Sequence, residues 1–414
     1  MTASDAPFRW RAVAVSAFLP TILFSIGEGA IIPVIPVVAS SLGATLAVAG
    51  FIAAMILVGE LLGDIPSGAL VARVGERTAM IGACGLSVGG LLIAVLARDP
   101  LWLGVGILLM GIAAAVFALA RHAFMTSFVP LAQRARALST LGGTFRFGFL
   151  VGPFLTAGAI QLTGTVESAL WIDLVAALLT GVVLLVLADP AAGHPAGDTV
   201  GDGAIEVAEE THGLFRTIAA RRDVLLTLGV GSMIVAALRA SRQVILPLWA
   251  VSILLDETST AVIIGIAGAV DFALFYLGGW IMDRFGRLWT ILPSLLGLAV
   301  GHLALALTHE LDARVTWFIA IAMVMSVANG IGAGILMTLG ADLADPRHPA
   351  PFLGAWRFTN DTGAALAPLI VVGITAAASL AVATGVLGVV GLVGAVILRV
   401  TVPRHSARPP ASHG

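Results

Sequence analysis

Ionisable side chains inside apolar stretches are the residues of this chain that could do chemistry. The acidic ones are Glu28, Glu60, Asp64, Asp271 and Asp361, and the basic ones are Arg121, Arg146, Arg239, Arg242 and Arg357. A charge at the depth of a bilayer core costs several kcal/mol unless it is paired or hydrated, so each of these residues needs a physical reason. Equal numbers of acids and bases would allow complete pairing, in which case the residues only brace helices. The same side chains could instead bind a charged solute or a proton.

Glu28 is the leading candidate for chemistry, because it stands between two glycines within the first apolar stretch. Burial among apolar groups favours the neutral form of a carboxyl group, so Glu28 could bind a proton at physiological pH. A carboxylate that binds either a proton or a cationic solute, and never both, exchanges one for the other. The alternative is a static ion pair with an arginine such as Arg239.

The arginines offer a second kind of chemistry. Arg121 and Arg146 fall at similar depths in neighbouring stretches, and two guanidinium groups placed together would form a bidentate anion site. Alternatively, Arg121 neutralises Glu60 or Asp64. Arg357 and Asp361 are four residues apart and could pair on one helix, and Asn329 could add a polar contact where an Asn-Gly pair interrupts its stretch.

The elements that must position these residues are membrane-spanning helices. The chain is 59% hydrophobic and 11% charged, against roughly a quarter charged in an ordinary soluble domain. A helix needs about 20 apolar residues to cross a bilayer, and lipid offers the backbone no other hydrogen-bond partner. Twelve stretches meet this length, at residues 12–38, 48–71, 78–96, 101–127, 138–161, 168–188, 224–251, 260–281, 289–308, 315–340, 352–375 and 380–398.

An internal repeat arranges these stretches into two sets. Residue n matches residue n+211 without a gap, so that Gly68 lies over Gly279, Arg73 over Arg284 and Gly75 over Gly286. Two like-oriented repeats are typical of transporters that open first to one side of the membrane and then to the other. We therefore expect an all-α integral membrane protein of twelve transmembrane helices in two pseudo-symmetric six-helix bundles. The bundles would comprise residues 1–190 and 224–400, with a cytoplasmic linker at 191–223 and a cytoplasmic tail at 401–414.

The repeat also compares the charges of the two halves. Glu60 lies over Asp271, each thirteen residues before a loop arginine, which suggests a repeated partner for that arginine. Glu28 lies over Arg239, so equivalent positions carry opposite charges.

Arginines outside the expected spans predict the orientation. When loops are assigned alternately to the two sides, only Arg98 and Arg314 fall on the side opposite the termini. Positive residues gather on the cytoplasmic side, so both termini are expected in the cytoplasm. The expected location is the plasma (inner) membrane, and the expected state is a monomer.

Two related loops carry the clearest motif. The first reads from Gly68 through Arg73 and Gly75 to Arg77, and the second from Gly279 through Asp283, Arg284 and Gly286 to Arg287. They resemble the signature loop of the major facilitator superfamily, and the resemblance covers nearly all of the chain outside linker and tails. In that family the loop is associated with holding the outward-facing state, so we call these residues the latch. The first copy carries Ala72 where an aspartate is usual, and its latch could rely on Asp64 or Glu60 instead.

The fifth stretch contains Gly148, Gly152 and Pro153 in a Gly-x-x-x-Gly-Pro run. Glycines at this spacing let helix backbones touch, and the proline bends its helix. The run resembles the antiporter motif of the twelve-span drug/proton exchangers in the same family. The closing double glycine of that motif is replaced by Thr156 and Ala157.

Together these features predict a secondary transporter, with proton-coupled efflux of small amphipathic or hydrophobic compounds as the preferred function. A proton symporter or facilitator that imports a small metabolite or anion is the first alternative, and a nontransporting membrane sensor or assembly protein is the second. Expected partners are a small-molecule substrate, protons and the lipid bilayer. The sequence lacks a phosphate-binding Gly-x-x-x-x-Gly-Lys loop, a metal-spaced His or Cys cluster and a basic nucleic-acid surface, so we expect no nucleotide, metal, cofactor, nucleic acid or enzymatic activity.

Overall fold

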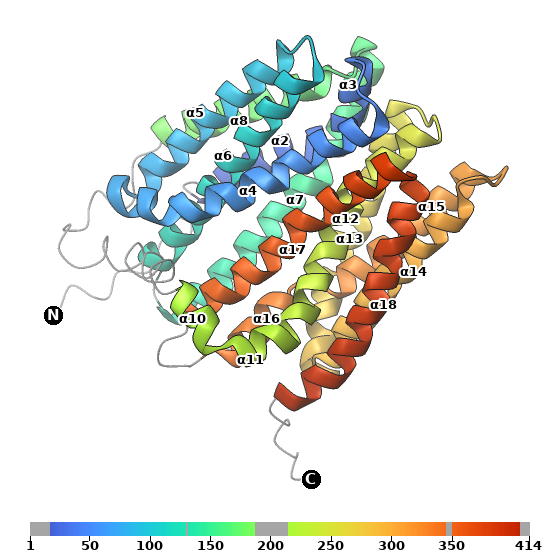
Figure 1. The fold of residues 1–414 in the computed structure, drawn as a ribbon. Helices are drawn as coiled ribbons and strands as arrows, with labels where there is room; N and C mark the ends of the chain where they lie inside the picture. The colour runs from blue at the N-terminus through green and yellow to red at the C-terminus, as the bar shows by residue number, and fades with distance from the viewer. Residues whose placement is uncertain (1–16, 130, 187–213, 345–349, 406–414) are drawn as a thin grey trace.

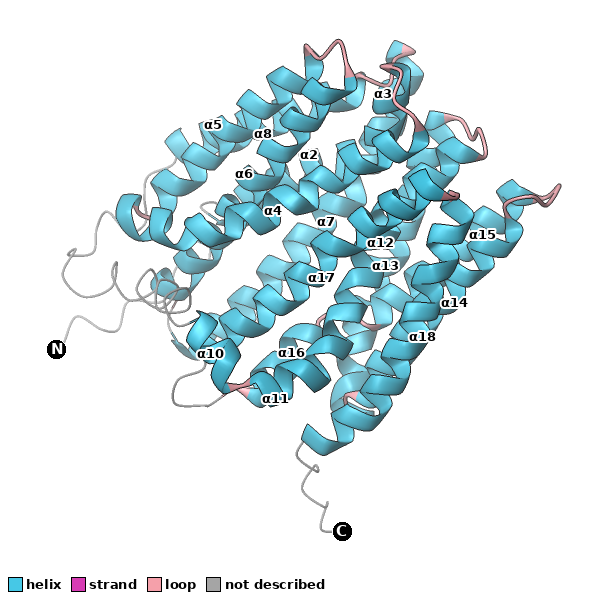
Figure 2. Ribbon diagram, in the orientation of Figure 1, coloured by secondary structure: helices cyan, strands magenta, loops and turns pink. Residues whose placement is uncertain are grey.

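The structure, a computed structural model, describes residues 17–129, 131–186, 214–344 and 350–405. These residues form helices joined by short loops, and none of them forms a strand (Figure 2). In the amino-terminal half the helices are α2 (Leu19–Ile31), α3 (Ile35–Ser41), α4 (Leu46–Val74), α5 (Glu76–Val95), α6 (Pro100–Phe128), α7 (Leu131–Thr163) and α8 (Ser168–Val186).

The carboxy-terminal half begins with two short helices and a π-helical turn. Its elements are α10 (Leu214–Ala220), α11 (Arg222–Val224), η3 (Leu225–Gly229), α12 (Val230–Ser252), α13 (Glu257–Phe285), α14 (Leu288–Thr308), α15 (Arg314–Ile331), α16 (Ile335–Leu343), α17 (Ala350–Ala377) and α18 (Leu380–His405). The long helices of both halves lie roughly along one common axis, and consecutive ones run in opposite directions along it (Figure 1). We call the end where α10 and α11 lie the linker end, and the end where α3 lies the far end.

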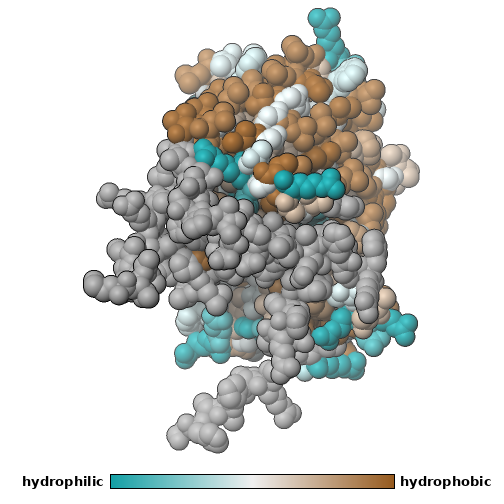
Figure 3. Space-filling view, turned by 90° about the vertical axis from the view of Figure 1, so that its left-hand side faces the viewer, coloured by the Kyte–Doolittle hydropathy of each residue, from teal (hydrophilic) through white to brown (hydrophobic). Residues whose placement is uncertain are grey.

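Length and composition allow the expected twelve crossings. Within the described ranges eleven segments could each span a membrane, and α2 with α3, bent by 45°, makes a twelfth. The bend follows from Pro33, which has no N–H to donate to the preceding turn. Exposed apolar side chains such as Leu178 and Val182 on α8 and Val393 and Val396 on α18 give the bundle a lipid-compatible surface. Hydrophobic side chains accordingly cover the upper part of the face in Figure 3.

Helix ends are defined by caps that the sequence encodes. The side chains of Thr45, Asp99 and Asp256 accept hydrogen bonds from backbone N–H groups in the first turns of α4, α6 and α13. The hydrogen bond from the Ser259 N–H lowers the pKa of Asp256. At the opposite ends of α4 and α13, Gly75 and Gly286 take positive φ angles of 81° and 96°, which residues with a Cβ rarely adopt.

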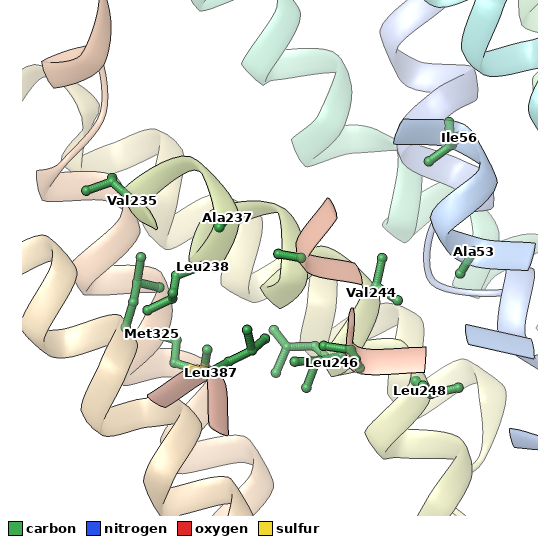
Figure 4. Packing of buried hydrophobic residues seen from close by; sticks show 14 of the residues in the cluster. Ala53, Ile56, Val235, Ala237, Leu238, Val244, Leu246, Leu248, Met325 and Leu387 are labelled. Carbon is green, nitrogen blue, oxygen red and sulfur yellow. The ribbon is translucent and has the colours of Figure 1, made fainter. Parts of the chain in front are cut away.

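The halves meet at the far end through apolar side chains. One buried cluster includes Ile35 and Ala53 of the amino-terminal half together with Leu248 and Trp249 of α12. Gly50 lets α4 and α12 approach closely, since a Cβ at position 50 would stand 2.9 Å from Leu248 Cδ2. Figure 4 shows α4 residues facing Val244, Leu246 and Leu248 across this boundary. The far end is therefore sealed by hydrophobic packing.

Toward the linker end the contacts between halves are polar and aromatic. α4 packs on α17 and α7 packs on α13. Phe147 of α7 meets Phe272 of α13 edge-on at 6.4 Å between ring centroids. An ion pair between Asp64 and Arg357 joins α4 to α17. The two ends of the molecule are thus closed by different kinds of interaction.

Candidate functional site

A cavity of about 130 Å³ lies between the halves and collects most of the expected acidic residues. Its walls come from α2, α4, α6, α7 and α17, and its lining includes Phe24, Glu28, Leu57, Glu60, Leu61, Asp64, Ala114, Ala115, Phe117, Ala118, Arg121, Phe145, Arg357, Asp361 and Ala364. Most of this lining belongs to the amino-terminal half, and α17 supplies the opposite wall. We call this the acidic cavity.

Glu28 is buried at 7% exposure and lines the acidic cavity from α2. No described arginine lies within ion-pair distance of its carboxyl group, and the ion pair with Arg239 that the sequence left open is not formed. Beside it, Phe24 stacks on Phe117 of α6, with ring centroids 4.3 Å apart. Glu28 is thus a carboxyl group on an apolar wall, free of a fixed charge partner.

Close contact between α2 and α7 fixes the position of the helix that carries Glu28. A Cβ on Gly152 would stand 2.5 Å from the backbone of Gly29 and Ala30, and one on Gly148 would stand 2.5 Å from Ser25 Cβ. Because these distances are far below normal contact, the small residues of the Gly-x-x-x-Gly run are required where they stand.

Thr156, which with Ala157 replaces the closing double glycine of the antiporter motif, has a structural role of its own. Its hydroxyl donates a 2.7 Å hydrogen bond to the Ala30 carbonyl oxygen. The bend after α2 directs the Val34 N–H to Ile31 instead, so the Ala30 oxygen needs another donor. Thr156 supplies it and ties α7 to the broken turn just beyond Glu28.

Arg121 and Arg146 lie apart, each over a phenylalanine ring. The guanidinium carbon of Arg121 is 4.9 Å from the ring centroid of Phe145, within the amino-terminal half. That of Arg146 is 4.7 Å from the ring centroid of Phe275 on α13, across the boundary between halves. The bidentate anion site that their similar depths suggested is therefore not formed. Arg121 lines the acidic cavity with Glu60 and Asp64 but has no ion pair with either among the described contacts.

Asp64, Arg357 and Asp361 form a charged group at one side of the acidic cavity. Arg357 binds Asp64 at 3.1 Å and Asp361 at 3.2 Å, so the expected pair within α17 extends to a residue of the other half.

A second polar group is centred on Asp271 in the carboxy-terminal half. Arg242 binds Asp271 at 2.9 Å and the Ser326 hydroxyl at 2.7 Å, and the Asn329 side chain donates to Asp271 at 3.1 Å. Arg239 donates to the Asn329 carbonyl oxygen at 2.9 Å. The sequence suggested Asp271 as a partner of the latch arginine, but it pairs with Arg242, because Arg284 lies more than three helical turns farther along α13.

Comparison with known proteins identifies the fold and the family. The family model described as Major Facilitator Superfamily matches residues 17–274 and 228–414. The chain belongs to the major facilitator superfamily. It is an integral membrane protein and a secondary transporter of this family rather than an enzyme.

Solved structures of POT family transporters share the fold at low sequence identity. A POT family transporter in complex with a thioalcohol-conjugated peptide has a TM-score of 0.78 and 13% identity, covering 96% of this chain and 97% of that one. A POT family transporter in complex with 5-aminolevulinic acid has a TM-score of 0.76 and 12% identity over the same shares. In sequence, a triacylglyceride transporter of Mycobacteroides abscessus is 33% identical over 91 residues, 22% of this chain and only 17% of that protein's length.

The latch loops of this superfamily member bind within their own halves. Arg77 donates to the Leu184 carbonyl oxygen of α8 at 2.9 Å, and Arg287 binds Asp342 of α16 at 2.7 Å and Asp283 at 3.7 Å. The hydrogen bond to Asp342 raises the pKa of Arg287. In the same loops Arg73 is exposed, and the guanidinium carbon of Arg284 lies 5.9 Å from the Trp280 ring centroid. Gly68 lies before Arg73 on α4, and Gly279 lies before Arg284 on α13.

One buried acid of this transporter was not predicted from the sequence as a site residue. Asp173 on α8 is 3% exposed and packs beside Gly27, the residue before Glu28. It lies near the start of its stretch, where a single sequence cannot separate a membrane-depth residue from an interfacial one. The apolar run around it, Leu170 to Leu174, was the available signal.

Proposed function

We propose that this protein is a proton-coupled exporter of small amphipathic or hydrophobic compounds, and that Glu28 is the residue that binds the proton. The observation that carries the proposal is a buried carboxyl group facing a cavity without an ion pair to any described residue. An unpaired carboxyl group at this depth is costly when ionised, so proton binding and binding of a cationic group both relieve the cost. Competition between them would couple the two fluxes.

The lining of the acidic cavity supports an amphipathic cargo. Phe24, Phe117 and Phe145 offer apolar and aromatic surface, while Glu60 and Arg121 offer polar groups beside it. Pockets of this mixed kind suit small organic molecules with one polar part. One protein with a similar segment is named a triacylglyceride transporter, and triacylglycerides are largely apolar molecules.

The α2–α7 contact supports assignment to the drug/proton antiporter group. The Gly148 and Gly152 contacts and the Thr156 hydrogen bond hold α7 against the helix of Glu28. A motif on α7 can therefore govern coupling without touching solute itself.

In the proposed cycle the protein lies in the plasma (inner) membrane and its linker end faces the cytoplasm, an orientation that the arginine distribution supports. A proton from outside neutralises Glu28 and releases the solute, and rocking of the halves then exposes the protonated site inward. A membrane potential contributes about 2.3 kcal/mol per charge for each 100 mV. We assign to the latch residues the role of holding the alternate state, with Arg73 and Arg284 able to form new contacts when the halves move.

Import of an anion is the second candidate function. Arg146, Arg239 and Arg242 lie near one carboxylate of the described residues, Asp271, at the boundary between halves. This excess of positive charge would suit a carboxylate or phosphate group of a metabolite.

Transport into proteoliposomes under an imposed pH gradient separates the two functions. Solute that moves against the proton flux indicates an exporter, and solute that moves with it indicates a symporter. Under our proposal the Glu28→Gln variant loses the response to the gradient, because glutamine cannot bind the proton. Asp312→Asn, which removes an exposed carboxylate from the loop between α14 and α15, is the matched control and should respond like the wild type.

A further inference from the structure

Asp173 on α8 is a buried carboxyl group that the proposed cycle does not use. A Cβ on Gly27 would collide with Asp173 Oδ1, so the carboxyl group occupies the space that any other residue at position 27 would need. The other oxygen, Oδ2, is fully buried and has no hydrogen-bond partner among the described residues. Glycine at 27 thus admits a second carboxyl group directly beside the turn that carries Glu28.

Among the described residues, Asp173 forms no ion pair with a cation. α8 packs against α2, α5 and α7. The ionisable group of α2 is Glu28, whose negative charge repels that of Asp173. On α5, Glu76 and Arg77 lie in the first turn at the linker end, where Arg77 binds Leu184, and Cys84 lies by Gly181. Between Gly148 and Thr163 the sequence of α7 has no ionisable residue.

An ionised carboxylate in these surroundings would be buried with no opposite charge and with one oxygen unbonded. Such a group costs several kcal/mol, and it avoids the cost by holding a proton. Asp173 is the sixth residue of α8, about 8 Å along the helix from its start at the far end. Protons that arrive from that end would therefore meet Asp173 near the level of Glu28.

We propose that Asp173 is a proton-binding site and that it exchanges its proton with Glu28. Its part in coupling rests on the proposed function of Glu28, whereas proton binding at Asp173 does not. Two neighbouring carboxyl groups resist simultaneous ionisation, so loss of a proton from one favours retention by the other. The pair would pass a proton between the far end and the acidic cavity.

Infrared difference spectroscopy of the full chain in lipid tests proton binding without any transport. A protonated carboxyl group has its own C=O stretching band, and labelling aspartate with ¹³C shifts bands from Asp but leaves bands from Glu. We expect wild-type protein at neutral pH to show a label-sensitive band that is missing in Asp173→Asn and retained in Asp312→Asn. Absence of any label-sensitive band from the wild type, or its persistence in Asp173→Asn, would overturn the proposal.

The coupling role is tested by counting protons moved per solute molecule. Asp173→Asn, and Gly27→Ala, which displaces the carboxyl group without removing it, should both lower this ratio or shift its pH dependence. An unchanged ratio and pH profile in both variants would exclude exchange with Glu28. If Glu28→Gln kept full coupling while the infrared band of Asp173 remained, the proposed function would fail and the proton site would stand.

Discussion

Asp64 on α4 and Arg357 on α17 form a 3.1 Å ion pair that joins the two halves of the transporter beside the acidic cavity. The side chains are 23% and 52% exposed, and Asp361 holds the same arginine at 3.2 Å. A half-exposed pair contributes little net stability, so its separation costs little. The apolar seal at the far end has no such charged contact in its cluster. We therefore expect the linker end to part more readily.

A double-mutant cycle measures this contact. We expect Asp64→Asn and Arg357→Gln to show a coupling free energy of about 0.5–1 kcal/mol in the free energy of unfolding in detergent, because the pair is partly hydrated. The cycle on Arg222 and Asp223, whose side chains are 76% and 97% exposed, is the control and should give a value near zero. Equal coupling in both cycles would show that the Asp64–Arg357 pair holds nothing together.

Gly152→Ala should destabilise the protein by about 1–3 kcal/mol, because the added methyl group would enter the backbone of α2. Gly158→Ala on the same helix is the matched control. Its Cβ would meet no atom within 4 Å, so the change should be neutral or stabilise by up to about 1 kcal/mol. Thermal unfolding of both variants checks the difference, and a stable Gly152→Ala protein would disprove the close contact.

Thr156→Val keeps the shape of the side chain and removes the donor to the Ala30 carbonyl oxygen. We expect a loss of about 1–3 kcal/mol, since a buried carbonyl group at the bend would lose its partner. Thr163→Val, at the exposed end of α7, removes local hydrogen bonds with Ala159 and Thr165 that lie at the surface, and should change stability by less than about 0.5 kcal/mol. Equal effects in the two variants would contradict a special role for Thr156.

Asp271→Asn should destabilise by about 3–5 kcal/mol, because it leaves the charge of Arg242 buried without a counter-charge. On the same helix Asp283 is 83% exposed, and Asp283→Asn should stay within about 0.5 kcal/mol of the wild type. Denaturant unfolding in micelles compares the two. Tolerance of Asp271→Asn would show that the polar group around Asp271 is not a structural brace.

The sequence predicted the helices well, because membrane spans depend on composition and length. The stretch expected at residues 101–127 became α6, Pro100–Phe128, and the one at 168–188 became α8, Ser168–Val186. The bend within the first span was less visible, since Pro33 is compatible with either a kink or a continuous helix.

The sequence predicted most of the ionisable residues that line the acidic cavity, but it predicted the contacts between them less well. A contact depends on the rotation of each helix about its axis, which a single apolar sequence does not define. Arg121 and Arg146 were thus placed together at equal depth, although they face Phe145 and Phe275. For the same reason the approach of Asp173 to Gly27 had no clear signal in the sequence.

The role of Glu28 as the proton-binding residue is tested most directly by comparing two kinds of flux in one Glu28→Gln preparation in proteoliposomes. In Glu28→Gln we expect uphill solute transport driven by a pH gradient to be lost, because glutamine cannot exchange a proton. Exchange of labelled for unlabelled solute should continue, because the remaining lining of the acidic cavity is unchanged and glutamine keeps a polar group at this position. Uphill transport that persists at the wild-type rate in Glu28→Gln would show that Glu28 does not couple proton movement to solute movement.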